Sequence, residues 1–517
     1  MGVGRYVGVG WSLLLGTAVT YAKPPVRRRA LDLAPFRDAL AGWAPDRDAA
    51  VGRLLTGADI TRIGGLLAAG ELTAEELALH HLARIARLDP VLHAIIELDP
   101  TALDQARAAD ARRREGAVRG PLDGIPVTVK DNIETAGPMH TTAGAMALID
   151  HVAHADAPIV TALRSAGAAL LGKTNLSELA GAVSRLDGLS AVGGRTVNPH
   201  GRKLPPGGSS SGSAAAVAAG LCVVSVGTET SGSLLAPASF DGVVGMKPSR
   251  DLVSGAGIIP LVRFQDSAGP LARSVADAAA LLEVLAGRPL GAELADPSLA
   301  GVRVGVLRAD VLAQKSPLED TSDNAGVLAR ITEGFAKAGA TVTDVTLVAE
   351  PSFAAFEGDF TKVVVGGLTH DTMAYLAAAG APATTVAQLH AYNRRKPRLR
   401  MPGGQLFLDI AVTMDLSPDA YEAAAMTARE RATAILDGTF AATGADVLVS
   451  VSNRHSALYA TAGFPAISVP AGLRASGMPV GVTIIGKVGE DAALLRVAAA
   501  FEAATKLRVT PPDAGSA

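Results

Sequence analysis

The stretch GTETSGSLLAPAS, residues 227–239, places a serine in the setting that a nucleophile requires. Ser233 follows Gly232 directly, inside a run of small residues that begins at Thr230. A nucleophilic hydroxyl needs nearby backbone N–H groups that receive a developing oxyanion. Consecutive small residues with a glycine let several N–H groups point to one spot. Alone, the stretch also fits a plain turn, so its interpretation depends on the segments upstream.

A Gly/Ser-rich stretch, PPGGSSSGSAAAVAAG, lies just upstream at residues 205–220. Its loop opens into an alanine-rich segment with good helix propensity, so Ser209 and its two serine neighbours are expected near a helix start. Composition alone would also fit a flexible linker. The run LCVVSVGTE that comes next predicts instead a buried strand that leads into residues 227–239.

The third stretch, GIPVTVKDNI at residues 124–133, predicts an apolar strand that carries Lys130. Strand alternation puts Thr128 and Lys130 on one face and Asp131 on the other, so Asp131 is poorly placed to pair with the lysine. Desolvation in such a strand lowers the pKa of a lysine from about 10.4 toward neutrality. A neutral lysine can act as a general base, whereas a salt-bridged one cannot.

In this order, the three stretches resemble the amidase signature family of Ser–Ser–Lys hydrolases. The resemblance continues through DGVVGMKPSRDLVSGAGIIP (241–260) and QDSAGPLARSVADAAALL (265–282), and it covers roughly residues 55–505. Each motif by itself is weak, and the ordered set is specific. The resemblance implies one large domain, although length alone would suggest about three.

Residue by residue, the resemblance implies that Lys130 is the base, Ser209 the bridging serine and Ser233 the nucleophile. It also implies a cis peptide bond before the bridging serine. The backbone N–H groups implied for the oxyanion hole are those of Thr230, Ser231 and Gly232, together with Ser233 itself. The chemistry implied is hydrolysis of an amide through an acyl-enzyme, with no cofactor and no metal.

The chain departs from the family pattern around the nucleophile. The family usually has Asp-Thr-Gly-Gly-Ser-Ile-Arg, whereas Glu229 and Leu234-Leu235 stand at the acidic and Ile-Arg positions here. Ser211 also replaces a common glycine. An arginine can bind a carboxylate through a bidentate fork, and two leucines cannot. We therefore expect a neutral or apolar carboxamide as substrate rather than free glutamine, whether the leucines form a pocket wall or pack in the core.

Strands and helices alternate from residue 124 onward, which predicts an α/β sheet covered by helices on both faces. The resemblance implies that this sheet is mixed. Upstream, Thr73 and Glu76 predict a capping box that opens an amphipathic helix, which Asp89-Pro90 should end. We expect the amidase domain over residues 55–505 and a C-terminal tail over residues 506–517.

The N-terminus predicts a targeting segment and then a linker. Residues 6–22 are uncharged and precede Lys23, as in a signal peptide or a retained anchor over residues 1–22. The arginines at 27–29 disfavour translocation of the residues beyond them. An exported or envelope-associated protein is slightly favoured over a cytoplasmic one. Residues 23–54 are expected to form a linker with one short helix.

Composition excludes some partners and bounds others. The net charge of −3 and the 4% aromatic content offer no electrostatic or stacking case for nucleic acid. Cys222 is the only cysteine, so no intramolecular disulfide can form. No HExxH or spaced Cys/His set is present, which argues against a metal site. We expect a small-molecule amide as the ligand and no obligate partner subunit, and the sequence leaves a homodimer open.

Two further patterns have competing interpretations. GAALLGKT at residues 167–174 satisfies the P-loop spacing, but its four apolar middle residues predict a buried core strand. Asp266 fits either a pocket residue or the cap of a helix after it, and the cap is favoured. Asn175-Leu176-Ser177 is a formal glycosylation sequon that is expected inside the fold.

The function expected is therefore that of an amidase with a Ser–Ser–Lys triad. Three alternatives stay open: a glutaminase-type component of an amidotransferase, a catalytically silent binding protein on the same fold, and a P-loop nucleotide-binding protein.

Overall fold

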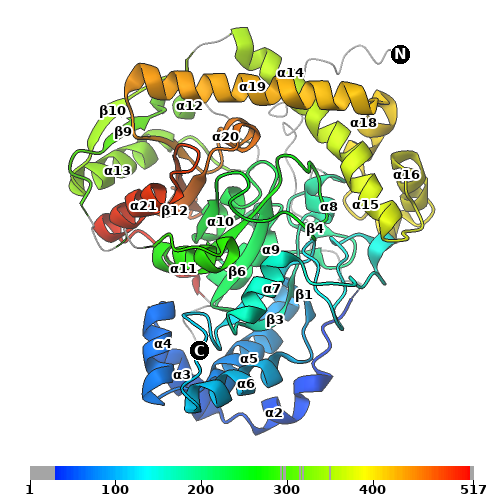
Figure 1. Cartoon of the computed structure of the whole chain (residues 1–517), viewed down its shortest axis with the longest axis vertical. Helices are drawn as coiled ribbons and strands as arrows, with labels where there is room; N and C mark the ends of the chain where they lie inside the picture. Colours follow the sequence, from blue (N-terminus) through cyan, green and yellow to red (C-terminus); the bar gives the residue numbers. More distant parts are fainter. Residues whose placement is uncertain are drawn as a thin grey trace.

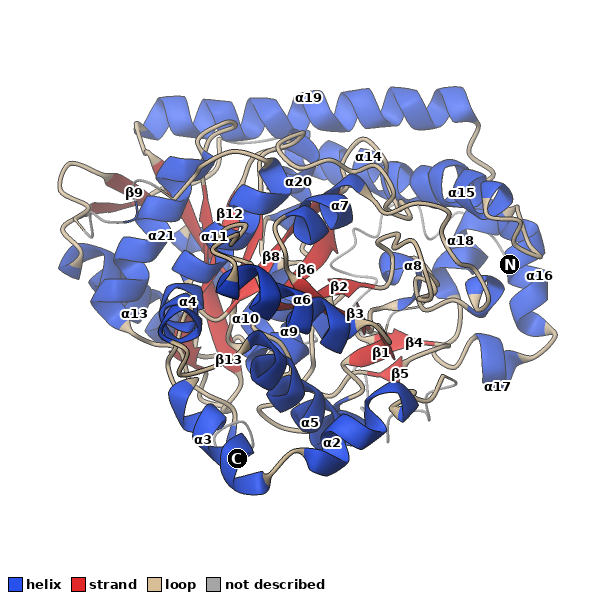
Figure 2. Ribbon diagram, turned by 60° about the horizontal axis from the view of Figure 1, so that its bottom comes forward, coloured by secondary structure: helices blue, strands red, loops and turns tan. Residues whose placement is uncertain are grey.

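A computed structural model describes residues 29–512 except 185, 292–293, 295–297, 314–315, 317–318 and 349–350. In this part of the chain one large mixed sheet runs through the centre of the molecule (Figures 1 and 2). Its 11 strands have the order β1-β3-β2-β6-β8-β7-β12-β13-β11-β9-β10. The expected mixed α/β sheet is confirmed.

The strands of the large sheet are β1 (Ile95–Leu98), β2 (Pro126–Lys130), β3 (Ala169–Thr174), β6 (Val224–Glu229), β7 (Val244–Lys247), β8 (Ser267–Ala272), β9 (Arg303–Val306), β10 (Thr341–Asp344), β11 (Val447–Val451), β12 (Ala466–Leu473) and β13 (Pro479–Ile485). A separate two-stranded ribbon consists of β4 (Leu189–Ser190) and β5 (Gly194–Arg195).

The α-helices of the described residues are α2 (Arg37–Gly42), α3 (Pro45–Leu54), α4 (Ile60–Ala69), α5 (Ala74–Leu92), α6 (Ala102–Arg114), α7 (Pro158–Ser165), α8 (Glu178–Gly181), α9 (Ser211–Ala218), α10 (Leu235–Asp241), α11 (Val275–Ala286), α12 (Arg308–Ala313), α13 (Asn324–Lys337), α14 (Pro351–Gly367), α15 (Met373–Ala378), α16 (Val386–Arg394), α17 (Pro397–Arg400), α18 (Leu406–Met414), α19 (Pro418–Thr443), α20 (Ser456–Ala462) and α21 (Asp491–Thr505).

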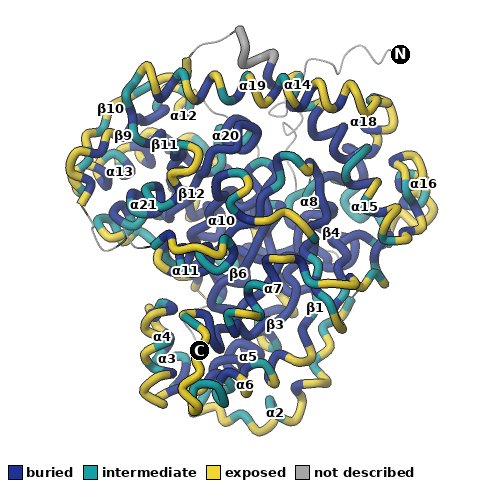
Figure 3. Tube along the Cα trace, in the orientation of Figure 1, coloured by how far each residue is buried: buried dark blue, intermediate teal, exposed yellow. Residues whose placement is uncertain are grey.

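Helices cover both faces of the sheet because the parallel strands are connected in two opposite directions. β2 lies between β3 and β6 and is parallel to both. The chain moves outward from β2 to β3 through α7, and then back past β2 to β6 through α9. Since such crossovers are right-handed, α7 and α9 lie on opposite faces. Figure 3 shows the enclosed strands as buried, with exposed positions on the outer helices.

The N-terminal helices correct one expectation. In the described part of the segment 23–54, α2 and α3 are helical and pack against α5, where a linker with one short helix was expected. Val51 is fully buried and Phe36 nearly so. Asp48 Oδ1 lies 2.7 Å from His80 Nδ1 on α5. The apolar and polar contacts together fix the segment to the domain. Residues 1–22, the expected signal peptide or anchor, lie outside the described residues.

Helix α5 begins as expected and ends later. Thr73 and Glu76 form the predicted capping box. The helix continues through Pro90 to Leu92, where Asp89-Pro90 was expected to end it. The Asp89 carboxylate accepts hydrogen bonds from two N–H groups just beyond the helix, at 2.7 and 3.0 Å, so these buried donors of the chain that leads into β1 are satisfied.

The helices that lie between β10 and β11 in the sequence form a layer that covers one end of the sheet (Figures 1 and 2). Its longest member, α19, packs along α14 and contacts α20. Asp371 and Thr372 in this layer bind the segment 260–263: Asp371 Oδ2 accepts from the Arg263 N–H at 2.8 Å, and Thr372 Oγ1 donates to Pro260 O at 2.7 Å. Across the described ranges, no helix combines the length and the apolar character needed to cross a membrane.

Candidate active site

Lys130 ends strand β2 and lies completely buried beside three hydroxyl groups. Its Nζ is 2.8 Å from Ser209 Oγ, 3.0 Å from Ser210 Oγ and 2.8 Å from Thr228 Oγ1. The carbonyl oxygen of Thr228, on the neighbouring strand β6, is 3.2 Å away. Parallel pairing of β2 with β6 brings the lysine and Thr228 together, and the start of α9 supplies the serines.

Burial lowers the pKa of Lys130 from 10.5 to about 7, and the negative charges of Asp266 and Glu229 oppose part of this shift. Asp131, as expected, does not pair with Lys130. Its carboxylate accepts hydrogen bonds from the Thr142 hydroxyl and from the Gly144 N–H. The lysine is therefore held in the range where it changes protonation near neutral pH.

The hydrogen bonds around Lys130 exclude Ser210 and leave Ser209 and Thr228 as the hydroxyls that can face the nitrogen lone pair. Ser210 Oγ–H donates to Thr228 O at 2.9 Å, so Ser210 can only accept from the lysine. Thr228 Oγ1 accepts from Asn132 Nδ2 at 3.1 Å, and its own O–H can still donate to the amine. A neutral amine has two N–H donors, which fit the Ser210 hydroxyl and the Thr228 carbonyl oxygen. Its lone pair then fits the hydroxyl of Ser209 or that of Thr228.

Backbone contacts place Ser233 next to the two serines of the first loop. The Gly208–Ser209 peptide bond is cis. The next residue, Ser210, donates its N–H to the carbonyl oxygen of Ser233 at 3.1 Å. Ser209 and Ser233 are buried, with exposed fractions of 3% and 8%. The three residues predicted to be catalytic thus come from β2, the α9 start and the β6–α10 turn, with Lys130 next to Ser209 through its side chain and Ser233 next to Ser210 through its backbone.

The β6–α10 turn presents backbone donors beside Ser233. Gly232 has a φ of +80°, which turns the chain sharply before the serine. Within the described residues, no hydrogen bond uses the N–H groups of Ser231, Gly232 or Ser233. The next two N–H groups, of Leu234 and Leu235, donate to Glu229 Oε2 at 2.7 and 3.2 Å. The carboxylate caps α10 and leaves the preceding N–H groups available to a ligand.

Gln265 and Asp266 hold this turn from the side, which corrects the expected helix cap. Asp266 precedes strand β8, and its carboxylate accepts from the Thr230 hydroxyl and from two N–H groups of the segment 260–263, at 2.8 and 3.0 Å. Gln265 Nε2 donates to Thr230 O at 2.6 Å, and its Oε1 accepts from Thr461 Oγ1 at 3.0 Å. Burial raises the pKa of Asp266 to about 7. A cavity of about 30 Å³, room for a water molecule, borders Asp266 and Thr228.

Sequence reasoning did not find Thr228, Gln265 or Thr461. Thr228 was visible only as a strand residue in its stretch, although its position opposite Lys130 becomes clear once β2 and β6 are known to be neighbours. Thr461 lies 196 positions from Gln265, and no local pattern signals that contact.

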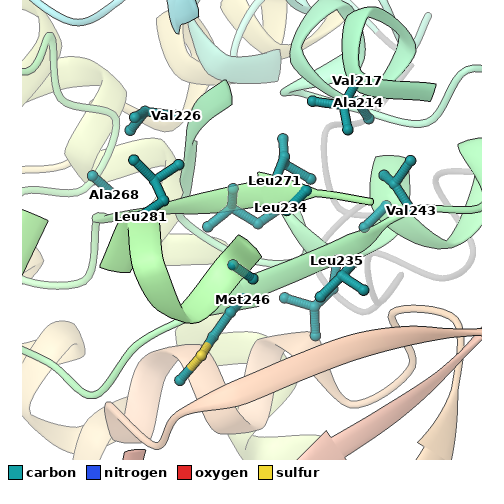
Figure 4. Packing of buried hydrophobic residues seen from close by; sticks show 14 of the residues in the cluster. Ala214, Val217, Val226, Leu234, Leu235, Val243, Met246, Ala268, Leu271 and Leu281 are labelled. Atoms are coloured by element: carbon teal, nitrogen blue, oxygen red, sulfur yellow. The ribbon is translucent and has the colours of Figure 1, made fainter. Parts of the chain in front are cut away.

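Leu234 and Leu235 are both fully buried, so the packing interpretation holds for both leucines. Figure 4 shows them among Val243, Met246 and Leu271, in the hydrophobic core. Where the family usually has an arginine, this chain has apolar packing and no positive charge at position 235.

The P-loop interpretation is wrong, because GAALLGKT contains strand β3 rather than a phosphate-binding loop. Lys173 is fully buried and donates to Ile133 O and, at 3.0 Å, to Thr141 Oγ1. Asn175 of the sequon is fully buried, as expected. Among the residues that the structure describes, no group of three or more His, Cys, Asp or Glu side chains could hold a metal ion.

Comparison with known proteins agrees with this architecture. A probable amidase of Arabidopsis thaliana is 33% identical, over 85% of this chain and 88% of its own. A glutamyl-tRNA(Gln) amidotransferase component of Symbiobacterium thermophilum is 34% identical, over 86% of this chain and 96% of its own. The structure of the peptide amidase of Stenotrophomonas maltophilia superposes with a TM-score of 0.79 at 37% identity, covering 88% of this chain and 99% of that one.

The model of the amidase family matches residues 76–458. This range includes all three stretches that surround Lys130 and extends from the capping box of α5 into α20. The relatives align with this chain over most of their own length, so the family match applies to the domain as a whole. The chain belongs to the amidase family.

Proposed function

We propose that this protein hydrolyses a neutral carboxamide, such as the C-terminal amide of a peptide, to the acid and ammonia. The observation that supports it is a fully buried lysine with a pKa of about 7, whose Nζ lies 2.8 Å from the Ser209 hydroxyl. Such an amine is neutral in about half of the molecules at pH 7 and can accept a proton. No partner protein is invoked, since the base, the serines and the N–H groups all come from one chain.

In the proposed reaction, Ser233 Oγ attacks the amide carbon. Its proton passes to Ser209 as the Ser209 hydroxyl proton passes to Lys130, so the amine becomes an ammonium. The carbonyl oxygen becomes an oxyanion that accepts from the N–H groups of the turn from Thr230 to Ser233.

The carbon–nitrogen bond then breaks. Lys130 returns its proton through Ser209 to the leaving nitrogen, which departs as ammonia, and Ser233 stays acylated. A water molecule attacks the ester by the same proton path and releases the acid.

The test of the nucleophile is covalent labelling. A fluorophosphonate should form one adduct on Ser233 in the parent protein, and Ser233→Ala should remove both the adduct and the amide hydrolysis while the far-UV spectrum is kept. An adduct on Ser209 or Ser210 would reverse the roles proposed here. Chymostatin, a competitive inhibitor of the peptide amidase relative, provides a reversible probe of the same site.

A glutaminase-type role in an amidotransferase is the second candidate, because the amidotransferase relative is 34% identical over 96% of its length. Apolar packing at Leu235 argues against it, since no cation at that position can pair with the carboxylate of glutamine. Values of kcat/KM for a peptide amide and for glutamine separate the two. Faster turnover of glutamine would reject the neutral-amide proposal.

A further inference from the structure

A short loop between β11 and α20 crosses the backbone beside the predicted nucleophile. A Cβ atom added to Gly232 would lie 2.5 Å from Asn453 Nδ2 and 3.1 Å from Ser456 Oγ. The hydroxyl groups of Ser456 and Ser231 are 3.2 Å apart. Two polar side chains of this loop therefore lie directly against the residue that precedes Ser233.

The loop is fixed in this position by contacts at both of its ends. Ser452 donates its N–H to Gly481 O at 2.9 Å, and its hydroxyl donates to Glu319 Oε2 at 2.9 Å. His455 adopts a φ of +69°, and its Nδ1 lies 3.0 Å from Ser450 Oγ. Because these groups are tied to the sheet, Asn453 is presented by a rigid element rather than by a free loop.

The side chain of Asn453 has hydrogen-bonding groups that could bind a ligand. Its side chain makes no hydrogen bond within the described residues, and the residue is half-buried. Ser456, by contrast, is paired with Ser231. A carboxamide offers one acceptor and two donors in a plane, which matches the C=O and N–H of another amide group. It offers no charge, so it does not favour an ionised ligand.

We infer that Asn453 is a specificity-determining residue that hydrogen-bonds to an amide group in the acyl part of the substrate. The inference rests on the proposed function: when ammonia is the leaving group, every substrate atom beyond the reacting carboxamide belongs to the acyl part. An acyl chain without an amide would cover the Asn453 side chain and leave it unpaired, which selects against such a chain. The substrate class is therefore an N-acylated amino acid amide or a peptide amide rather than a simple alkyl or aryl amide.

The experiment compares two amides that differ by one group. N-acetyl-phenylalaninamide carries an acetamido group that 3-phenylpropanamide lacks. The parent enzyme should prefer the former, and in Asn453→Ala the ratio of the two kcat/KM values should fall by about tenfold, mainly through KM, as expected for loss of a neutral hydrogen bond. Asn453→Leu, which keeps the volume, should give the same loss and guards against a misfolded alanine variant.

An unchanged ratio in both variants, or a parent enzyme without preference for the acetamido substrate, overturns the inference while amide hydrolysis itself stands. If the parent enzyme cleaves neither substrate but labels at Ser233, the proposed substrate class fails and the inference falls with it.

Discussion

Replacing Lys130 with methionine should change how the stability of the protein depends on pH. A pKa that falls from 10.5 to about 7 on burial corresponds to a free-energy cost of roughly 5 kcal/mol for holding this amine in the folded protein at or below pH 7. Above pH 7 the folded protein keeps Lys130 neutral, whereas the unfolded chain keeps it protonated up to about pH 10.5. Unfolding therefore takes up a proton, and the free energy of unfolding rises with pH.

The size of the effect is set by one proton. The slope is about 1.4 kcal/mol per pH unit between the folded and unfolded pKa values. Lys130→Met lacks this contribution, while all other groups stay the same in both proteins. From about pH 7.5 to about pH 9, the parent should therefore gain about 2 kcal/mol of unfolding free energy relative to the variant. Urea unfolding at both pH values, with equal m-values for the two proteins, measures the difference.

Activity gives the second readout of the same group. The parent should lose kcat/KM as the pH falls through about 7, because Lys130 becomes protonated, and Lys130→Met should be inactive at every pH. Lys247→Met is the matched control, since Lys247 is also buried, with a pKa lowered to about 8, and it donates to the carbonyl oxygens of Pro248 and Phe464. Lys247→Met should lose the part of the pH dependence of stability that comes from Lys247. The acidic limb of its kcat/KM should stay that of the parent. Parallel pH dependence of stability in the parent and Lys130→Met would refute a neutral Lys130.

Two further substitutions test the turn that precedes Ser233. Asp266→Asn removes a negative charge that raises the pKa of Lys130, so the acidic limb of kcat/KM should move to lower pH. The value of kcat should also fall about tenfold, because Thr230 loses its charged acceptor. An acidic limb that does not move would contradict the electrostatic coupling of Asp266 to Lys130. Gly232→Ala places a side chain at a φ of +80° and 2.5 Å from Asn453 Nδ2. Thermal unfolding should therefore show a loss of about 1–2 kcal/mol in the free energy of unfolding, and kcat should fall far more than KM rises. A stable variant with normal kcat would show that this backbone does not act in the reaction.

Local patterns predicted more of the site than of its surroundings. The strand that carries Lys130, the serine-rich helix start and the glycine turn at Ser233 were all visible in short segments, because alternation and propensity act over a few residues. The same reasoning misplaced Asp266, since a residue before an apolar run looks alike whether a helix or a strand comes next. It also ended α5 too early, because a proline in the last turn can be accommodated and the contacts beyond it form only in the folded chain.

By itself, the sequence determined the α/β class, through the alternation of strand and helix patterns along the chain. It also determined the apolar strand around Lys130 and the absence of an arginine at position 235, since these depend on residue types within one short segment. Only the tertiary structure decided that β2 and β6 are neighbours, and therefore that the hydroxyls of Thr228 and Ser210 lie within hydrogen-bond distance of Lys130. It also decided that the loop carrying Asn453 crosses Gly232, more than two hundred positions away in the chain. Contacts between such distant segments depend on strand order and on packing, which no pattern within a single segment encodes.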